Sequence, residues 1–139
     1  PKGFALDFWK IAMRPGKPLI FGKLGTTPLL GLPGNPVSTL VCAILFLRPA
    51  IAAMLGTETS APLLSARLSA PLAANDARQD YIRATLELRD GEYWTEPFPV
   101  QDSSMLGTIA AAGALIIRAP HAPALDAGAR VDIIPLTDA

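Results

Sequence analysis

Residues 36–55 form an almost uninterrupted apolar stretch, and this feature constrains the fold more than any other. Asn35 stands before it as a favourable helix N-cap, and Pro36 suits the first helical position. Gly56 follows the stretch, at the kind of position where many helices end. The sequence therefore predicts one helix over residues 36–55, with a kink at Pro49, whose ring displaces a backbone hydrogen bond.

A membrane span is the alternative reading of this helix, because a span needs about 20 apolar residues. The apolar run that begins at Val37 is interrupted after 11 residues by Arg48-Pro49, and no aromatic residues flank the helix. We therefore interpret it as a helix of a protein core or a subunit interface, and expect no membrane partner. Cys42 within it is expected to be a buried, inert thiol.

Short apolar runs bounded by Gly and Pro precede the helix. They cover Phe8–Met13, Leu19–Leu24 and Pro28–Leu32, with a turn at residues 25–27. Runs of this length and composition are typical of buried strands. Residues 1–58 are thus predicted to hold strands followed by one long helix.

The composition changes at residues 57–62, which are predicted to form a linker. After it, strands are predicted at Leu63–Leu72, Asp80–Arg89, Glu92–Phe98, Ala114–Arg118 and Arg130–Leu136, with one short helix at Ser103–Ala112. Asp90-Gly91 is a strong hairpin turn signal. Many short strands in so few residues predict a small barrel or sandwich. The expected domains are residues 1–58 and residues 59–139.

The zero net charge conceals a split between these two parts. Residues 1–58 carry six basic groups and two acids, and residues 59–139 carry six basic groups and ten acids. No carboxylate lies between Asp7 and Glu58, so this stretch lacks the oxygen ligands that Mg²⁺ requires.

Zero net charge argues against a nucleic-acid partner. One Cys and one His exclude a disulfide framework and an ordinary zinc site.

The turn before the helix has the pattern of an anion site, although a solvated basic face explains the charge equally well. A helix N-terminus offers unpaired N–H groups and partial positive charge. Pro33 and Pro36 would stiffen the loop, and Gly34 would let a ligand approach the backbone. Lys10, Arg14 and Lys17 lie upstream. Lys10 and Arg14, four residues apart, would share one face of an extended strand.

Three strings of residues carry a resemblance to a known family. Residues 13–18 read Met-Arg-Pro-Gly-Lys-Pro, residues 21–23 read Phe-Gly-Lys, and residues 31–38 read Gly-Leu-Pro-Gly-Asn-Pro-Val-Ser. Together they closely resemble the molybdopterin molybdenumtransferase family, whose eukaryotic relative is the E domain of gephyrin. Arg78, Asp80-Tyr81-Ile82-Arg83, Gln101–Ser103 and Gly128–Leu136 are similar to the family's C-terminal domain, so the resemblance covers nearly the whole chain.

The resemblance implies a transferase that inserts molybdate into adenylylated molybdopterin and releases AMP, assisted by a divalent metal, usually Mg²⁺. It implies a cytoplasmic homodimer, with molybdopterin adenylyltransferase as its pathway partner. The implied fold is α/β: the second half of a molybdopterin-binding α/β domain at residues 1–58, followed by a small all-β barrel domain at residues 59–139.

The resemblance also assigns site residues. The implied catalytic set is Lys10, Arg14, Lys17, Pro33 and Pro36, and the implied substrate and oxyanion set is Gly34, Asn35, Ser38, Arg83 and Ser103. Fixed cations and helix N–H groups suit molybdate, a tetrahedral dianion, and the phosphate charge that AMP departure leaves. Asp102 departs from the family's usual Gly, and either places a negative charge beside Ser103 or caps the following helix.

The first residue is Pro1, and we expect the chain to be a fragment of a longer protein. In the family the nucleotide-side motif and the metal-binding carboxylates lie upstream, so we expect an inactive fragment with no metal ligand of its own. Two alternatives stay open. One is a non-catalytic dimeric scaffold or partner-binding module of the same fold, and the other is a phosphate-binding domain with a different substrate.

Overall fold

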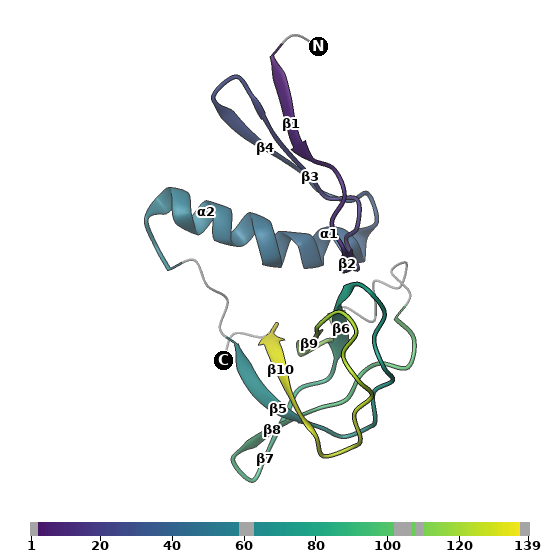
Figure 1. Cartoon of the computed structure of the whole chain (residues 1–139). Helices are drawn as coiled ribbons and strands as arrows, with labels where there is room; N and C mark the ends of the chain where they lie inside the picture. The colour runs from purple at the N-terminus through teal and green to yellow at the C-terminus, as the bar shows by residue number, and fades with distance from the viewer. Residues whose placement is uncertain (1–2, 59–62, 102–106, 108–109, 137–139) are drawn as a thin grey trace. The chain divides into compact units, whose positions relative to one another are not determined.

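The computed structural model describes residues 3–58, 63–101, 107 and 110–136. The chain forms two compact units, residues 1–60 and residues 61–139 (Figure 1). It is a mixed α/β structure in which strands outnumber helices.

The first unit begins with an antiparallel sheet in the order β1-β3-β4. Its strands are β1 (Phe4–Phe8), β3 (Ile20–Leu24) and β4 (Thr27–Gly31), and the two-residue β2 (Met13–Arg14) lies between β1 and β3 in the chain. β3 and β4 form a hairpin in which Leu24 pairs with Thr27. This confirms the predicted turn and the two strands beside it.

The predicted strand at Phe8–Met13 is wrong, because the strand lies earlier, at Phe4–Phe8. β1 pairs with β3 as far as Phe8, and the register shifts between Leu6 and Phe8. Beyond Phe8 the chain leaves the sheet and enters a loop that is closed by a 3.0 Å hydrogen bond from Ile11 N to Lys17 O. The apolar run therefore crosses the end of a strand, which hydrophobicity alone does not reveal.

One continuous helix follows, made of α1 (Pro36–Cys42), the π-helical turn η1 (Ala43–Leu47) and α2 (Arg48–Leu55). The side chain of Asn35 caps its start. Gly56 ends it in a left-handed conformation with φ 67°, which glycine adopts without strain. The predicted helix and both of its caps are confirmed.

The structure accommodates Pro49 by a local widening of the helix. Proline has no N–H to donate to the preceding turn, and its ring clashes with the carbonyl four residues back. The π-helical turn η1 lies immediately before this point, so Pro49 falls in the first turn of α2, where no N–H is required.

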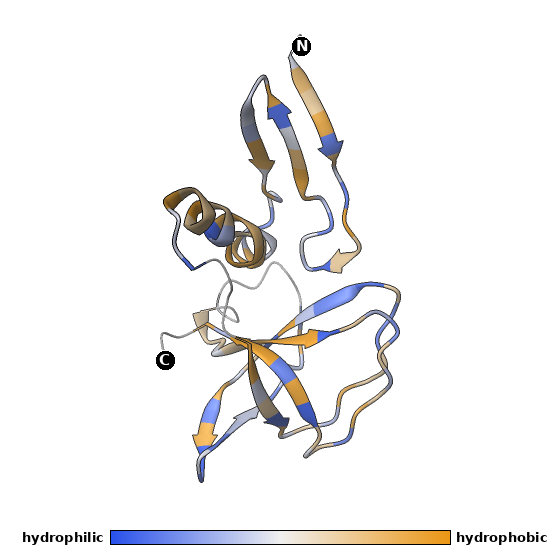
Figure 2. Ribbon diagram, turned by 60° about the vertical axis from the view of Figure 1, so that its left-hand side comes forward, coloured by the Kyte–Doolittle hydropathy of each residue, from blue (hydrophilic) through white to orange (hydrophobic). Residues whose placement is uncertain are grey.

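Burial of the helix is concentrated in its first two turns. Val37, Val41 and Cys42 are fully buried, as is Leu19 directly before β3. Toward the other end Met54 is 80% exposed, and Figure 2 shows the helix as mostly apolar, with one hydrophilic segment. Within the described chain, residues 36–55 form a helix that is long and apolar enough to cross a membrane, judged by length and composition alone. The prediction of a core helix therefore fits the first turns only.

The second unit is a twisted sheet with the strand order β6-β9-β10-β5-β8-β7. The strands are β5 (Leu64–Leu68), β6 (Gln79–Ala84), β7 (Glu87–Arg89), β8 (Glu92–Thr95), β9 (Ala114–Arg118) and β10 (Arg130–Pro135). Neighbours are antiparallel except β5 and β8, which are parallel. Its core includes the fully buried Leu68, Ile116 and Ile133.

The predicted hairpin at Asp90-Gly91 is confirmed, because both residues have positive φ, 49° and 80°. The single strand predicted over Asp80–Arg89 is wrong, since β6 and β7 lie at opposite ends of the strand order. The short helix predicted at Ser103–Ala112 falls mostly outside the described residues.

The sheet of the second unit curls, but its described strands do not close into a barrel. After β8, backbone hydrogen bonds join Thr85 N to Glu96 O at 2.9 Å and Phe98 N to Arg83 O at 3.0 Å. These bonds bring the segment after β8 to the end of β6. No strand ladder within the described residues joins β6 to β7, so the sheet is open in strand order where a closed barrel was expected.

Candidate functional site

The loop before α1 is held by side-chain hydrogen bonds. Asn35 Oδ1 accepts from Val37 N at 3.1 Å and from Ser38 N at 3.3 Å. Thr39 Oγ1 donates to Asn35 O at 2.9 Å and also to Pro33 O. Each bond joins the turn to the first turn of the helix, so the loop has little freedom to open.

This capping changes what the helix start offers to an anion. Pro36 has no N–H, and the N–H groups of Val37 and Ser38 already bond to Asn35. An anion that used these two groups would have to displace the Asn35 side chain. The open part of the loop is Gly34, which is exposed and has no atom within 4 Å of the place a Cβ would take. Close approach of a ligand to the backbone is therefore sterically possible at Gly34.

Lys10, Arg14 and Lys17 all lie in the segment between β1 and β3, with Arg14 in β2, and all three residues are exposed. The bond from Ile11 N to Lys17 O closes this loop and brings Lys17 beside the segment that follows Lys10. Lys10 lies outside the strands, so the prediction that one extended strand carries Lys10 and Arg14 is wrong. These cations are carried by a segment that the Ile11–Lys17 bond closes, and not by the face of one strand; we call it the basic loop, residues 10–17.

The basic loop packs against the helix at Gly16. This glycine has φ +108°, and a Cβ there would lie 2.5 Å from Cys42 Sγ. Cys42 is seven residues beyond Asn35, which corresponds to about 10 Å along a helix axis. The basic loop is therefore fixed to the same helix whose start carries Gly34 and Asn35, about two turns away. Burial raises the pKa of the Cys42 thiol to about 11, in keeping with the inert role expected for it.

In the second unit, Arg83 is a buried residue of β6 and is bonded to Gln101. Gln101 Oε1 accepts from Arg83 N at 3.1 Å and from Arg83 Nε at 3.4 Å. Gln101 Nε2 donates to Arg83 O at 3.0 Å and to Phe98 O at 2.9 Å. Ser103 and Asp102 lie outside the described residues. The sequence analysis missed the pairing of Gln101 with Arg83, although Gln101 belongs to the string that resembles the family.

Other charged groups of the second unit form surface pairs. Arg78 pairs with Asp76 at 2.7 Å. Glu92 accepts from Arg67 Nε at 2.6 Å and from Arg130. The hydrogen bond from Arg67 is the main reason that the pKa of Glu92 lies below its ordinary value of 4.5. These are partly exposed pairs, which contribute little to stability.

The residues present do not fit a metal site. Among the described residues, no three His, Cys, Asp or Glu side chains gather closely enough to hold a metal ion. In the first unit, Asp7 and Glu58 are the acids, and the basic loop contains none. This donor set suits an anion and not Mg²⁺.

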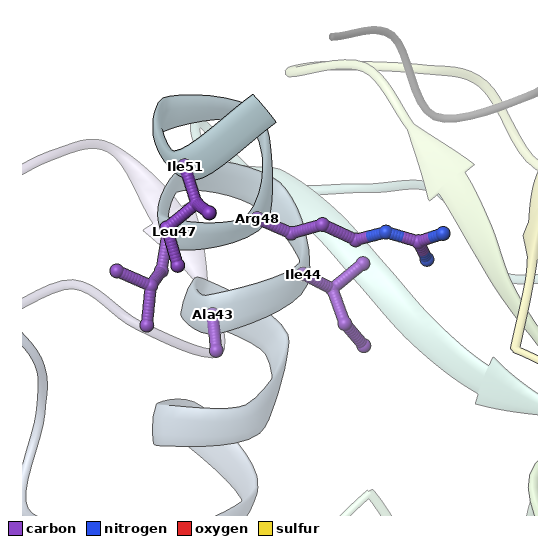
Figure 3. Close-up of a pocket in the computed structure, with 5 residues that line it drawn as sticks. All are labelled: Ala43, Ile44, Leu47, Arg48 and Ile51. Carbon is purple, nitrogen blue, oxygen red and sulfur yellow. The ribbon is translucent and has the colours of Figure 1, made fainter. Parts of the chain in front are cut away.

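An open hollow of about 290 Å³ lies against the long helix, lined by Ala43, Ile44, Leu47, Arg48 and Ile51. Figure 3 shows Leu47 and Ile51 on one side of the helix and the Arg48 side chain extending to the other. None of the predicted site residues lines it. The hollow is apolar and shallow, and so is unlike the basic loop in chemistry.

The structure describes an α/β unit with an exposed basic loop, followed by a small β unit. Residues 1–53 match the model of a probable molybdopterin binding domain, and residues 65–136 match the model of the MoeA C-terminal region, domain IV. The chain belongs to the MoeA family of molybdopterin molybdenumtransferases, of which it represents the C-terminal portion.

Individual relatives agree with this placement. The molybdopterin molybdenumtransferase of Haemophilus influenzae is 32% identical over 133 residues, which is 94% of this chain and 33% of that protein. Molybdopterin molybdenumtransferase 1 of Mycobacterium tuberculosis is 35% identical over 137 residues, 92% of this chain and 32% of that protein. The molybdenum cofactor synthesis protein cinnamon of Drosophila melanogaster is 33% identical over 116 residues, 81% of this chain and 19% of that protein.

A solved structure shares the fold. The molybdopterin biosynthesis MoeA protein of Pyrococcus horikoshii superposes with a TM-score of 0.80 at 24% identity, over 99% of this chain and 34% of that one. The chain thus spans about a third of the length of the two bacterial relatives and of this structure.

Proposed function

We propose that this chain is part of an enzyme that inserts molybdate into adenylylated molybdopterin with release of AMP. The observation that carries the proposal is the basic loop, held by Gly16 against the helix that Asn35 caps. Its three exposed cations suit the binding of phosphate or molybdate oxygens. The relatives named molybdopterin molybdenumtransferase, which align over nearly the whole chain, support this choice of substrates.

The proposed roles follow from charge and access. Lys10, Arg14 and Lys17 hold oxyanions, and the phosphate charge that develops as AMP departs is stabilised by these fixed cations. Pro33 and Pro36 keep the loop rigid, so that Gly34 and Asn35 present backbone and amide groups without reorganisation. From the second unit, Arg83 and Ser103 serve as oxyanion ligands in the complete enzyme.

The remaining expectations belong to the complete enzyme. We propose that Mg²⁺ neutralises phosphate charge there and is held by residues outside the described part of this chain, which offers it no ligand set. A cytoplasmic homodimer that receives its substrate from molybdopterin adenylyltransferase accords with the resemblance. A small closed barrel is the proposed form of the C-terminal domain in the complete enzyme.

The test is molybdate-dependent AMP release from adenylylated molybdopterin, measured for the complete reading frame and for the 139-residue chain. We expect release by the complete protein and none by the chain alone. Lys17→Ala should lower this release at least tenfold (roughly 1.4 kcal/mol of transition-state stabilisation). Lys23→Ala is the matched control, because Lys23 is also an exposed lysine of the first unit but lies in β3, outside the basic loop.

Equal activity of the Lys17→Ala and Lys23→Ala proteins would remove the basic loop from the mechanism. If a folded complete protein released no AMP, the scaffold alternative would replace the enzymatic one. Displacement of molybdate by phosphate at similar affinity would favour a phosphate-binding domain with a different substrate.

A further inference from the structure

We infer that Trp9 is a positioning residue that holds the ammonium group of Lys10 at the start of the basic loop. The contact between the two side chains stands on the structure alone. Its consequence for catalysis rests on the proposed function, in which Lys10 binds an oxyanion.

The ammonium group of Lys10 lies over the face of the Trp9 indole ring. Its Nζ is 3.7 Å from the ring centroid, well within the distance at which the electron-rich face of a ring attracts a cation. Indole is the aromatic side chain that attracts cations most strongly. Both residues are exposed, Trp9 to 56%, so the contact lies at the surface of the first unit, where an anion in solution can meet the ammonium.

The backbone is held on both sides of this pair. Before it, the Phe8 ring packs against the Phe21 ring of β3, with 5.7 Å between the ring centroids. After it, Ile11 N donates to Lys17 O at 3.0 Å, which is the bond that closes the basic loop. The indole ring therefore extends from a short segment that is anchored at both ends, and it gives the ammonium a partner in a fixed place.

The charge of Lys10 is held without being cancelled. Within the part of the chain that the structure describes, no carboxylate pairs with Lys10. The similar contact in the second unit places Arg89 over the Trp94 ring at 5.5 Å, but Arg89 also pairs with Glu87 at 2.7 Å. A neutral ring leaves the full positive charge on the ammonium, and the N–H groups directed away from the ring can donate to an oxyanion.

A lysine that is already in place binds an anion more tightly than a mobile one. Lysine has many rotamers, and ordering its side chain when a ligand binds costs affinity. An exposed cation–π contact is weak, so its removal should weaken anion binding only about threefold. Because the whole effect of Trp9 passes through Lys10, it should disappear when Lys10 is absent.

The first experiment needs no substrate. In the 139-residue chain with ¹³C-labelled lysine, the Cε–H signal of Lys10 is identified by its absence in Lys10→Arg. The ring current of an indole moves protons above its face upfield, so this signal should lie upfield of that of Lys23, an exposed lysine of β3. Trp9→Leu should abolish the upfield shift, and the control Trp94→Leu should leave it unchanged. A Lys10 signal that is the same in Trp9→Leu and wild type overturns the inference.

The second experiment is a double-mutant cycle in the complete protein, with molybdate-dependent AMP release as its readout. The kcat/KM is measured with molybdate and with adenylylated molybdopterin varied in turn. Trp9→Leu should lower kcat/KM for at least one of them about threefold, mainly through KM, and Trp9→Phe, which keeps a weaker aromatic face, should lower it less. In a Lys10→Ala background, Trp9→Leu should have no further effect.

Two results of the cycle contradict the inference. A loss of equal size in the wild-type and Lys10→Ala backgrounds would mean that Trp9 acts by itself or through the fold. An unchanged kcat/KM in Trp9→Leu would mean that the held ammonium is not used. Trp9→Phe serves if Trp9→Leu does not fold, because its Lys10 signal should keep part of the upfield shift.

Failure of the proposed function gives a different pattern. A wild-type protein that is folded but releases no AMP refutes the enzymatic proposal, while the Lys10 signal still decides whether Trp9 holds the ammonium.

Discussion

Asn35 and Gln101 are polar side chains that each form hydrogen bonds to backbone groups, one in each unit. Each bonds to backbone groups: Asn35 accepts from two N–H groups at the helix start, and Gln101 bonds to the N–H and C=O of Arg83, whose C=O also accepts from Phe98 N. A polar side chain used in this way is committed to structure. Ligand binding at either place must leave these bonds intact or replace them.

Replacing Asn35 by Ala removes the cap of the helix. We expect the first unit to lose about 1 kcal/mol of unfolding free energy, the usual cost of an Asn N-cap lost to Ala. Urea unfolding followed by circular dichroism measures the difference. Asn35→Asp keeps an acceptor oxygen at the same place and should retain most of the stability. If the two variants were equally unstable, the cap would not be the cause.

Glu92 should make the second unit less stable in acid. Its pKa is lower in the folded chain than its ordinary value of 4.5, mainly because Arg67 donates to it. A lowered pKa gives a stabilisation that is complete above about pH 4.5 and is lost as the pH falls through the folded value.

The measurement is the urea midpoint between pH 7 and pH 3 for wild type, Glu92→Gln and the exposed control Glu96→Gln. Glu92→Gln should be less stable than wild type at pH 7, and the gap should close in acid. A gap that is constant with pH would show that the ion pairs with Arg67 and Arg130 contribute nothing.

At the scale of elements, local signals predicted the structure well and non-local pairings were missed. The helix over residues 36–55 was found because its caps are adjacent to it in sequence. The Asp90-Gly91 hairpin was found for the same reason. The strand Phe4–Phe8 was misplaced because its limit is set by pairing with β3. The bonds between Arg83 and Gln101 were missed because they depend on a fold that brings distant segments together.

Gly16 decides how the basic loop attaches to the helix, and its replacement by Ala should be severe. The added Cβ would lie 2.5 Å from Cys42 Sγ, at a φ of +108° that disfavours any side chain. We expect a loss of about 2–4 kcal/mol, from overpacking and backbone strain together. Thermal or urea unfolding gives the value.

Gly34→Ala is the matched glycine variant, since its Cβ would meet nothing within 4 Å, and it should change stability little. In a Cys42→Ala background, Gly16→Ala should recover part of the loss but not the strain. Equal stability of the two glycine variants would mean that the basic loop is not packed as described.

At the scale of the whole molecule, the two units differ in how fully they cover their apolar residues. The second has a core drawn from several strands of its sheet. The first leaves large apolar side chains exposed in β1, directly after it and in the helix, including Leu6, Trp9, Ile51 and Met54. Patches of this kind commonly mark surfaces that bind other protein.

We expect the 139-residue chain to self-associate through these exposed apolar side chains as its concentration rises. Met54→Lys should shift sedimentation velocity profiles toward the monomer without lowering the unfolding free energy, because Met54 is 80% exposed. Leu88→Lys, at an exposed position of β7 in the second unit, is the control. A wild-type chain that stays monomeric at every concentration would contradict the expectation.

The π-helical turn η1 affects which deletions the long helix can tolerate, in this chain and in its homologues. A single π turn is equivalent to one residue inserted into an α-helix, which the wider turn accommodates. Deleting one residue from Ala43–Leu47 would restore a regular α-helix at this point, and Pro49 would then lie in a helix interior, where its ring clashes with the carbonyl four residues back. Single-codon deletions here should be tolerated far less well than substitutions, and homologues that lack the extra residue should also lack the proline.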